Sequence, residues 1–449
     1  MNLGHLKSDL LKEIIQKWSI PQSDQSEYHS LIIERPSFDL YQLLKSLKYD
    51  STSYFKNKED DLESIFIGVQ ASFSTHDEIQ KMESLSLQNK ELYFLGGFNF
   101  DFDKNGELEW ADLRPGLFIL PYLEIRKKSG VVRFIVHFPR TIYNDKISQA
   151  RWIDSLDENF KLEDDDTLNN QVDIKSIKLN PNKLSWAKIF RKGMQNIVDE
   201  SFHKIVLARK KVFELKKPVN LGLVLNSLEG LNPNSYLIKF CLNKKAYFVS
   251  NTPERLIKIE GNEIVTEAIA GTRPMGGSDE ENEDFINDLK SSYKEISEHR
   301  FVRKNLEDNL SEYSNSLQWE VEEEILQLKY IQHLYSRLRV QCSSRPNFFK
   351  IIRKLHPTPA VGGTPWKKAK SFLIKNESLN RGLYASPVGI YSKDYSDFSV
   401  AIRSALFTID RVHIYAGAGI VKGSDEEGEW NEIENKMKNF ENIISGGAK

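Results

Sequence analysis

The chain has 449 residues, of which 40% are hydrophobic and 28% are charged, and its 62 basic and 64 acidic side chains give a formal net charge of −2. This balance argues against a broadly basic nucleic-acid-binding protein and against an acidic tail protein. Aromatic residues make up 11% of the chain, which is enough for a large core and excludes disorder over most of its length. Two cysteines, Cys241 and Cys342, are too few for a disulfide framework or a thiolate metal site, so we expect buried thiols in a reducing compartment.

The N-terminal segment predicts an amphipathic helix and not a signal peptide. Apolar residues recur at helical spacing from Leu6 to Trp18, and Asp9 and Glu13 interrupt the apolar stretch. The longest apolar runs in the chain fall far short of the roughly 20 residues that are needed to span a bilayer. We therefore expect a soluble, cytoplasmic protein.

The first third of the chain mixes helical and strand-like patterns but shows no catalytic constellation. Strands are predicted at residues 93–100 and 131–138, where aromatic and β-branched residues dominate. Two polar stretches, 157–170 and 276–284, have the composition of surface loops. No internal repeat and no low-complexity linker is present.

From about residue 184 onward, short strand-like runs are separated by single long helical patterns. The predicted strands span residues 204–208, 236–240, 246–250, 263–268, 398–409 and 412–416. The predicted helices span residues 285–313, 322–339 and 429–444. Consecutive strands with short turns favour antiparallel sheets with helices packed outside them. The pattern therefore predicts an α+β fold and not a doubly wound βαβ series.

Lys204 lies in the apolar run FHKIVLAR and has two interpretations. A lysine at a strand end usually keeps its ammonium group in water and protects the strand from aggregation. A half-buried lysine instead loses affinity for its proton and can act as a general base. Glu254 follows Pro253 in the segment NTPERL, which by itself is ordinary turn chemistry.

Two pairs of glutamates each lie three residues apart and so share one helical face: Glu295 with Glu298, and Glu429 with Glu432. The second pair lies in the first turn of its predicted helix, where the helix dipole favours carboxylates. Each pair alone is equally well explained as solvated charge near a helix start. Together the two pairs can converge on one hard divalent cation such as Mg²⁺, which prefers oxygen ligands. No cysteine and histidine cluster suggests zinc.

Three glycine-containing segments, AIAGTR (268–273), AVGGT (360–364) and AGAGIV (416–421), accompany the predicted strands. Glycine allows backbone N–H groups to approach a small anion closely, although each segment alone is equally consistent with a turn or bulge. None of them is a Walker loop. Arg403 lies among small residues in the strand-like run 398–407, which leaves room for a ligand carboxylate; a structural salt bridge is the alternative.

In their order along the chain, these segments resemble the chorismate-utilising enzyme family, and within it isochorismate synthases. The matching segments are HKIVLAR, TPERL, AIAGTR, KEISEH, LHPTPAVGG, YASPVG, AIRSA, AGAGIV and GEWNEIENK. They span about residues 200–440, and several independent motifs in one order make the resemblance specific. The resemblance implies a single large domain, 1–449, with two large stacked antiparallel β-sheets and helices packed outside. Within it, residues 1–180 would form a variable part and residues 184–445 the chorismate-binding catalytic part.

The resemblance also discriminates among members of the family. Members that use water as the nucleophile have a lysine at the position of Lys204, whereas anthranilate synthases have a glutamine there. Aminodeoxychorismate synthases have a lysine at the position of Ala270. Salicylate synthases share the lysine but usually depart from HPTPAVGG, so isochorismate synthase is favoured and salicylate synthase is the alternative. The chain departs from the family at Ser386, where glycine is usual, and at 396–397, where Gly-Glu is common.

The resemblance implies a reversible exchange of hydroxyl position on chorismate. Neutral Lys204 would take a proton from a water that attacks C2, and protonated Glu254 would donate a proton to the departing C4 hydroxyl. Mg²⁺ would be held by Glu298 and Glu432, with Glu295 and Glu429 as direct ligands or through water. The implied substrate-binding residues are Thr272, His356, Tyr384, Arg403, Gly417, Gly419 and Lys436. For His356, a core or helper role is an equal alternative.

Chorismate is the partner that the resemblance implies, with no nucleic acid and no membrane. Because the implied nucleophile is water and not ammonia, we expect no amidotransferase subunit. A third interpretation is a non-catalytic protein that binds chorismate, but the intact Lys204, Glu254 and four glutamates argue against it. The sequence leaves open the oligomeric state and whether the product serves menaquinone, a siderophore or salicylate.

Overall fold

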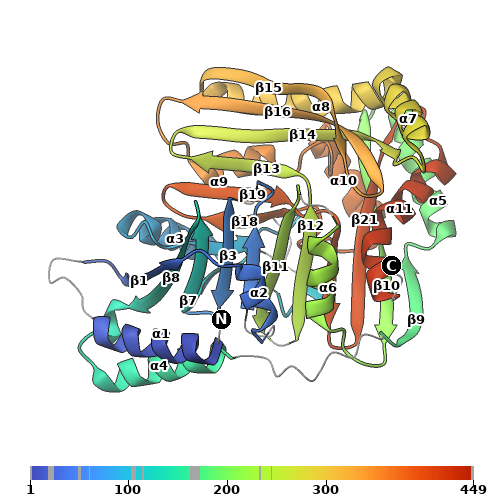
Figure 1. The fold of residues 1–449 in the computed structure, drawn as a ribbon. Helices are drawn as coiled ribbons and strands as arrows, with labels where there is room; N and C mark the ends of the chain where they lie inside the picture. Colours follow the sequence, from blue (N-terminus) through green and yellow to red (C-terminus); the bar gives the residue numbers. More distant parts are fainter. Residues whose placement is uncertain are drawn as a thin grey trace.

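The computed structural model describes residues 3–18, 25–48, 52–59, 61–102, 108–113, 116–161, 172–231, 234–243 and 245–445. Within these ranges the chain forms two antiparallel sheets that pack face to face. In Figure 1, strands β13 to β16 of one sheet run across the direction of β10, β12 and β21 of the other. The predicted α+β fold with two stacked antiparallel sheets is confirmed.

The larger sheet has the strand order β1-β8-β7-β3-β2-β11-β12-β20-β21-β10-β17, and β9 pairs with β10. Its strands are β1 (Tyr28–Pro36), β2 (Thr52–Lys56), β3 (Leu62–Ile67), β7 (Leu123–Lys128), β8 (Val131–Pro139), β9 (Ile174–Asn180), β10 (Lys204–Leu215), β11 (Tyr236–Asn243), β12 (Ala246–Thr252), β17 (Gly363–Thr364), β20 (Ser404–Thr408) and β21 (Arg411–Val421).

The smaller sheet has the order β15-β16-β14-β13-β19-β18-β5-β6-β4. Its strands are β4 (Ala71–Phe73), β5 (Phe94–Gly97), β6 (Phe118–Leu120), β13 (Arg255–Glu260), β14 (Glu263–Pro274), β15 (Ser314–Gln327), β16 (Ile331–Cys342), β18 (Pro387–Tyr391) and β19 (Tyr395–Val400). Both sheets combine early and late parts of the chain, because β2 pairs with β11 and β5 pairs with β18.

The helices are α1 (Leu3–Lys17), α2 (Leu40–Lys45), α3 (His76–Gln88), α4 (Lys146–Asn159), α5 (Lys183–Val198), α6 (Leu221–Glu229), α7 (Asp279–Ser291), α8 (Tyr293–Leu310), α9 (Phe348–Leu355), α10 (Trp366–Asn376) and α11 (Glu426–Ile444). Helix α1 confirms the predicted N-terminal helix, and it lies beside α4 under the early strands of the larger sheet (Figure 1).

Two hydrophobic cores follow from the alternation of side chains along the strands. One core lies between the sheets, where Phe248 of the larger sheet packs in the same cluster as Phe398 of the smaller one. The other core covers the opposite face of the larger sheet, where Val249 of β12 shares a cluster with Trp186 of α5 and Ile433 of α11.

The helix predicted at residues 322–339 is wrong, because this segment forms the hairpin of β15 and β16. Its glutamates have good helix propensity, but Leu334, Leu338 and Val340 of β16 are buried at alternate positions, on one face of the smaller sheet. Two-residue alternation with a buried face therefore prevails over local propensity.

The helix predicted at 285–313 is two helices, α7 and α8, separated at Ser292, whose side chain caps α8. Helix α7 begins at Asp279, inside the stretch 276–284 that was predicted as a loop, and Ser278 caps it by accepting a hydrogen bond from the backbone of Glu281. In the other predicted loop, 157–170, α4 continues to Asn159, and residues 162–170 lie outside the described part of the chain.

The continuous strand predicted at 398–409 is also wrong. Strand β19 ends at Val400 in the smaller sheet, and β20 begins at Ser404 in the larger one. Between them the chain changes sheet, and Arg403 has a positive φ of 48°. Arg403 therefore lies at a crossing between the sheets and not on a strand face.

Candidate active site

The chain crosses between the two sheets at two places that lie side by side. The first crossing, from β12 to β13, carries Glu254, and the second, from β19 to β20, carries Arg403. Backbone hydrogen bonds join them: the N–H of Asn251 donates to the carbonyl of Arg403 at 3.1 Å, and the N–H of Val400 donates to the carbonyl of Glu254 at 3.0 Å. The two side chains, far apart in sequence, are thereby brought to one place.

A cavity opens at these crossings, with an empty volume of about 860 Å³ that includes its open mouth. The predicted site residues that line it are Glu254, Thr272, Glu295, Glu298, Tyr384, Arg403, Gly417, Gly419, Glu432 and Lys436. Lys204 and Glu429 lie just behind this lining, because they bond to Glu298 and to Lys294, which both belong to it.

Glu254 is buried, with 3% of its surface exposed. Burial raises the pKa of this carboxyl to about 8, and the negative charge of Glu267 adds to the shift, while Lys204, Lys436 and Arg403 oppose it. Glu254 therefore carries a proton at neutral pH. A carboxyl in this state can donate a proton to a leaving group.

Lys204 is the first residue of β10, and its side chain is fully buried. Its Nζ lies 2.6 Å from Oε1 of Glu298. Burial tends to raise the pKa of Glu298, but the charge and hydrogen bond of Lys204 outweigh this effect, so the pKa of Glu298 lies below its usual value. A Cβ at Gly419 would lie 2.8 Å from Cε of Lys204, so the lysine occupies space that only glycine leaves open.

The two pairs of glutamates come from the N-terminal turns of α8 and α11. Ser292 caps α8 and Asp425 caps α11, each by accepting a hydrogen bond from the backbone of the first turn. The contact between Nζ of Lys294 and Oε1 of Glu429, 3.0 Å long, joins the two helices at this end. The two helices therefore meet at this end, and Glu295, Glu298 and Glu432 line the same cavity.

Each glutamate of this group is paired with a basic side chain. Apart from Lys204 with Glu298 and Lys294 with Glu429, these pairs are Arg273 with Glu295 at 2.8 Å and Lys436 with Glu432 at 2.6 Å. Burial raises the pKa of Glu429 to about 7, and the negative charge of Glu432 adds to this shift. The main cause of this elevated pKa is burial, which disfavours the charged form of the carboxyl.

The donor set fits a hard divalent cation in its chemistry, since carboxylate oxygens are the ligands that Mg²⁺ prefers. Within the described ranges, however, no three acidic, histidine or cysteine side chains are close enough together to hold a metal ion. In this arrangement the lysine and arginine partners neutralise the carboxylates instead.

His333 is a member of the cavity wall that the sequence analysis missed. Its Nδ1 lies 3.1 Å from the carbonyl of Gly271, and its Nε2 lies 2.9 Å from Nη2 of Arg403. Because a carbonyl only accepts and a guanidinium only donates, Nδ1 carries the proton and Nε2 accepts one from Arg403. Burial and the charge of Arg403 hold the pKa of His333 well below its usual value, so the ring is neutral.

The glycine of the AGT segment forms a β-bulge, as one of the two interpretations of this segment predicts. Strand β14 shifts register between Ala270 and Thr272, where Gly271 has a φ of 79°. The bulge places Thr272 opposite His333, and the hydroxyl of Thr272 lies 3.1 Å from Nδ1 of the ring. His333 was missed because it lies in the segment that was predicted as a helix.

The edge of β21 beyond Tyr415 has no pairing with β20 and faces the cavity. There the carbonyl of Gly417 accepts a hydrogen bond from Nζ of Lys436 at 3.0 Å. A Cβ at Gly417 would lie 3.0 Å from the hydroxyl of Tyr384, whose ring stacks on Tyr415 with centroids 5.5 Å apart. The alternating glycines therefore leave room in the cavity next to two polar side chains.

His356 lies outside the cavity lining. Its Nε2 donates to the carbonyl of Phe100 at 2.9 Å, and burial lowers its pKa to about 4. The same HPTPAVGG segment contributes Ala360 and Val361 to the cavity wall. No contact of His356 with the cavity supports the predicted substrate-binding role, and the surroundings of this histidine match the core alternative.

A family model described as chorismate binding enzyme matches residues 13–445 of the chain. Isochorismate synthase, chloroplastic, of Catharanthus roseus is 37% identical over 269 residues, which are 59% of this chain and 46% of the plant protein. Isochorismate synthase MenF of Haemophilus influenzae is 29% identical over 445 residues, which are 96% of this chain and 97% of that protein. This chain thus spans about half the length of the plant relative and nearly all of the bacterial one.

Among solved structures, MenF, the menaquinone-specific isochorismate synthase from Escherichia coli, matches with a TM-score of 0.86 and 24% sequence identity. The match covers 97% of this chain and 99% of the other, and it shows a shared fold. None of the helices in the described ranges combines the length and the apolar character that crossing a membrane requires.

Proposed function

The chain belongs to the chorismate binding enzyme family, and we propose that it converts chorismate reversibly to isochorismate. One observation carries this proposal: Glu254, buried and protonated at neutral pH, lines the same cavity as Glu298, whose carboxylate bonds to the buried Nζ of Lys204. The names of the relatives from Catharanthus roseus and Haemophilus influenzae agree with it.

Lys204 acts as the general base and Glu254 as the general acid. The side-chain nitrogen of Lys204 takes a proton from a water molecule as the oxygen of that water bonds to C2 of the ring. The ring double bond shifts, the C4–O bond breaks, and Glu254 supplies the proton with which the hydroxyl leaves as water. Each such proton transfer contributes typically about 10²–10⁴-fold to the rate. Atoms balance, since one water enters and one departs.

Basic side chains on the cavity wall bind the carboxylates of the substrate. Arg403 remains charged at neutral pH although burial lowers its pKa to about 10. Burial also acts to lower the pKa of Lys436, but the charge of Glu432 outweighs it and the pKa lies above its usual value. Both cations are thus available to a carboxylate, with the hydroxyls of Thr272 and Tyr384 and the backbone at 417–419 beside them.

The carboxylates of Glu295, Glu298, Glu429 and Glu432 would hold Mg²⁺. When bound, the cation supplies an anchor for the ring carboxylate of the substrate and neutralises part of its charge. The chemistry of the four donors supports this assignment, since carboxylate oxygens are the ligands that Mg²⁺ prefers.

The product assay tests the function directly. Purified protein is incubated with chorismate and Mg²⁺, and the products are separated by chromatography. We expect isochorismate, which returns to chorismate when it is supplied alone. Salicylate with equimolar pyruvate would instead establish the alternative, a salicylate synthase. Chorismate binding by calorimetry without any product would show a non-catalytic protein.

We expect the protein to work in the cytoplasm. Because the nucleophile in this reaction is water, we expect no amidotransferase subunit. Adding glutamine or ammonium to the assay is then expected to leave the product unchanged. An aminated product would contradict the proposed nucleophile.

A further inference from the structure

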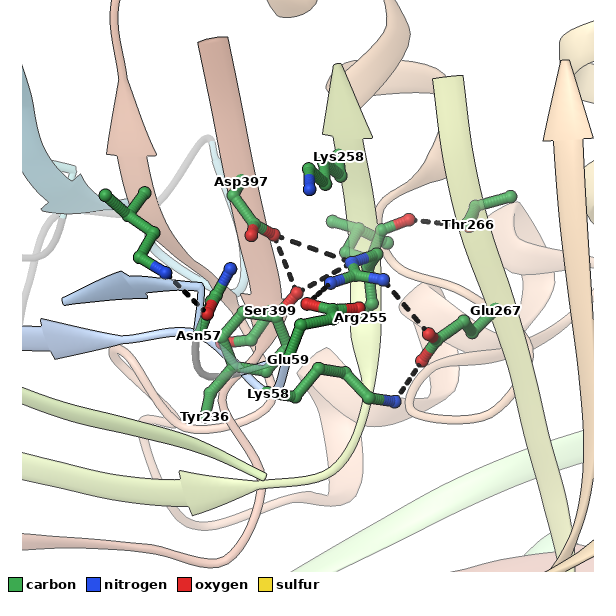
Figure 2. Close-up of polar contacts among 12 residues, drawn as sticks. Asn57, Lys58, Glu59, Tyr236, Arg255, Lys258, Thr266, Glu267, Asp397 and Ser399 are labelled. Carbon is green, nitrogen blue, oxygen red and sulfur yellow. Dashed lines mark hydrogen bonds and ion pairs between the residues drawn. The ribbon is translucent and has the colours of Figure 1, made fainter. Parts of the chain in front are cut away.

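Figure 2 shows a cluster of charged side chains that includes Lys58, Arg255, Glu267 and Asp397. At its centre is Arg255, the residue that follows the general acid Glu254 in the chain. The side chain of Arg255 is fully buried. Its guanidinium contacts Glu267 at 3.2 Å, the hydroxyl of Tyr236 at 2.8 Å and Asp397 at 3.6 Å. The backbone on the C-terminal side of Glu254 is therefore fixed by several charged contacts.

Lys58 holds the backbone on the N-terminal side of the acid. This residue lies in the turn between β2 and β3, in the early part of the chain. Its Nζ donates to the carbonyl of Pro253 at 3.0 Å and pairs with Oε2 of Glu267 at 2.6 Å. The side chain of Lys58 is 10% exposed and that of Glu267 is 1% exposed, so water weakens this pair little.

The two contacts of Lys58 act on Glu254 in different ways. The hydrogen bond to Pro253 holds the peptide that precedes the acid, while Thr252 accepts a hydrogen bond from the N–H of Glu254 at 3.3 Å. The pair with Glu267 places a positive charge against a carboxylate whose negative charge raises the pKa of Glu254. Lys58 thus lies next to the acid in the structure but 196 positions from it in sequence (254 − 58).

We propose that Lys58 is a positioning residue for the general acid Glu254, because it fixes the peptide before Glu254 and neutralises the carboxylate of Glu267 behind it. This proposal rests on the proposed function. The contribution comes from the first 180 residues, for which the sequence indicated no role in the chemistry.

Groups on every element around the acid contribute to its electrostatic environment. They are Lys204 of β10, Glu267 of β14, Lys436 of α11, Arg403 at the second crossing and Tyr384 before β18. The negative charge of Glu267 raises the pKa of Glu254, and the three cations lower it. Without Lys58, Glu267 keeps Arg255 and the hydroxyl of Tyr335 at 3.2 Å as partners, but it loses one compensating cation.

The pH dependence of the rate therefore tests the proposal, because a purely structural role of Lys58 would leave the pKa of Glu254 unchanged. Because Glu254 must be protonated to act, the rate falls as pH rises through its pKa. Removing the positive charge of Lys58 leaves more negative potential at the acid and shifts this alkaline limb to higher pH. Removing the negative charge of Glu267 shifts the limb to lower pH.

The experiment measures kcat and KM for chorismate against pH in Lys58→Met, Lys58→Arg and Glu267→Gln. We expect Lys58→Met to lower kcat about 10- to 100-fold with little change in KM, as a misplaced catalytic group does. We expect Lys58→Arg to retain most of the activity, because arginine keeps the charge and the donor. The matched control is Lys56→Met, which removes a nearby lysine whose carboxylate partner is Glu229, at 3.7 Å, and is expected to change neither quantity.

Wild-type kcat and an unmoved alkaline limb in Lys58→Met would overturn the proposal. A loss of rate that arginine fails to rescue, with the limb unmoved, would also overturn it, because that pattern indicates general destabilisation. If circular dichroism shows that Lys58→Met does not fold, Glu267→Gln decides: a limb that stays in place overturns the role assigned to this charge pair.

Failure of the proposed function is distinguishable from failure of this inference. If the wild-type protein forms no isochorismate, the function fails, whatever the variants do. A crystal structure of Lys58→Met then decides the positioning role alone. A displaced carboxyl of Glu254 supports the role, and a carboxyl in its original place overturns it.

Discussion

The early part of the chain, residues 1–180, and the later part, residues 184–445, contribute differently to the same site. All residues to which we assign contact with chorismate or Mg²⁺ come from the later part. The early part supplies side chains that contact the residues next to them, such as Lys58, which donates a hydrogen bond to the carbonyl before Glu254. The chemistry is thus concentrated in one part of the sequence, whereas the support for it comes from both.

Trp110 is a second support from the early part of the chain. Its Nε1 donates to the carbonyl of Asn380 at 3.2 Å, and its ring stacks on Tyr415, with centroids 5.6 Å apart. Tyr415 in turn stacks on Tyr384 in the cavity wall. A Cβ at Gly382 would lie 2.1 Å from the Trp110 ring, so the segment before Tyr384 packs against the indole without any intervening side chain.

The difference between the two parts predicts how their variants behave. Substitutions of residues that transfer protons in the reaction mainly lower the rate of the chemical step, whereas substitutions of supporting residues change geometry and stability together.

The first prediction concerns the proposed general base and general acid, which both lie in the later part of the chain. Lys204→Ala and Glu254→Gln are each expected to lower kcat by roughly 10²–10⁴-fold, because each removes one proton-transfer partner.

Isothermal titration with chorismate provides the check that these variants still bind substrate. A matched control is Lys178→Ala, which removes an exposed lysine of β9 paired with Glu214. This control is expected to keep wild-type turnover. Normal turnover in Lys204→Ala would show that another group is the base.

The second prediction concerns the four glutamates of α8 and α11. Treatment with EDTA is expected to abolish isochorismate formation, and Mg²⁺ is expected to restore it, because the cation held by the four glutamates would anchor the ring carboxylate of the substrate. Glu432→Gln is expected to raise the Mg²⁺ concentration needed for half-maximal activity, since one anionic ligand is lost. Activity that is insensitive to EDTA would contradict the metal site.

Sequence motifs predicted most of this later part because they consist of several neighbouring residues that share one task. The order of the motifs indicated the fold and most of the cavity lining, including Glu254 and the glycines of β21. Arg403 lines the cavity but does not lie on the predicted strand, because the change of sheet at 401–403 has no signal in an alternating apolar run.

Supporting residues such as Lys58 and His333 could not be predicted, because each is a single residue whose partner lies far away in the chain. In the sequence, nothing distinguishes Lys58 from other lysines near turns. Its hydrogen bond to the carbonyl of Pro253 arises only in the folded chain. His333 was hidden for a different reason: the glutamate-rich segment before it has helical propensity, and only burial on alternate positions reveals the strand.

The third prediction addresses His333, a support that comes from the later part. His333→Ala removes the acceptor that holds the guanidinium of Arg403 at 2.9 Å. A hydrogen bond to a charged group contributes about 1.5–3 kcal/mol, so we expect KM for chorismate to rise roughly 10- to 100-fold. We expect kcat to change less, because the ring does not touch the reacting atoms.

His333→Gln serves as the matched variant, since its amide oxygen can accept from Arg403. It is expected to recover part of the affinity. A lower kcat with unchanged KM in His333→Ala would contradict a role in binding and would place this histidine in the chemical step.

The last prediction returns to the early part of the chain. Trp110→Phe keeps an aromatic ring on Tyr415 but removes the donor to Asn380 and part of the packing under Gly382. Loss of a buried hydrogen-bond donor costs about 1–3 kcal/mol, which we expect as a lower free energy of unfolding in urea denaturation. Because the segment that packs against Trp110 continues to Tyr384, we also expect a few-fold rise in KM for chorismate, the smallest effect of the series.

A matched control is Trp319→Phe. The indole of Trp319 donates to Glu307 away from the cavity, so its loss is expected to lower stability without changing KM. An unchanged KM in Trp110→Phe, with the same loss of stability, would show that the early part supports the fold at this point and not the site.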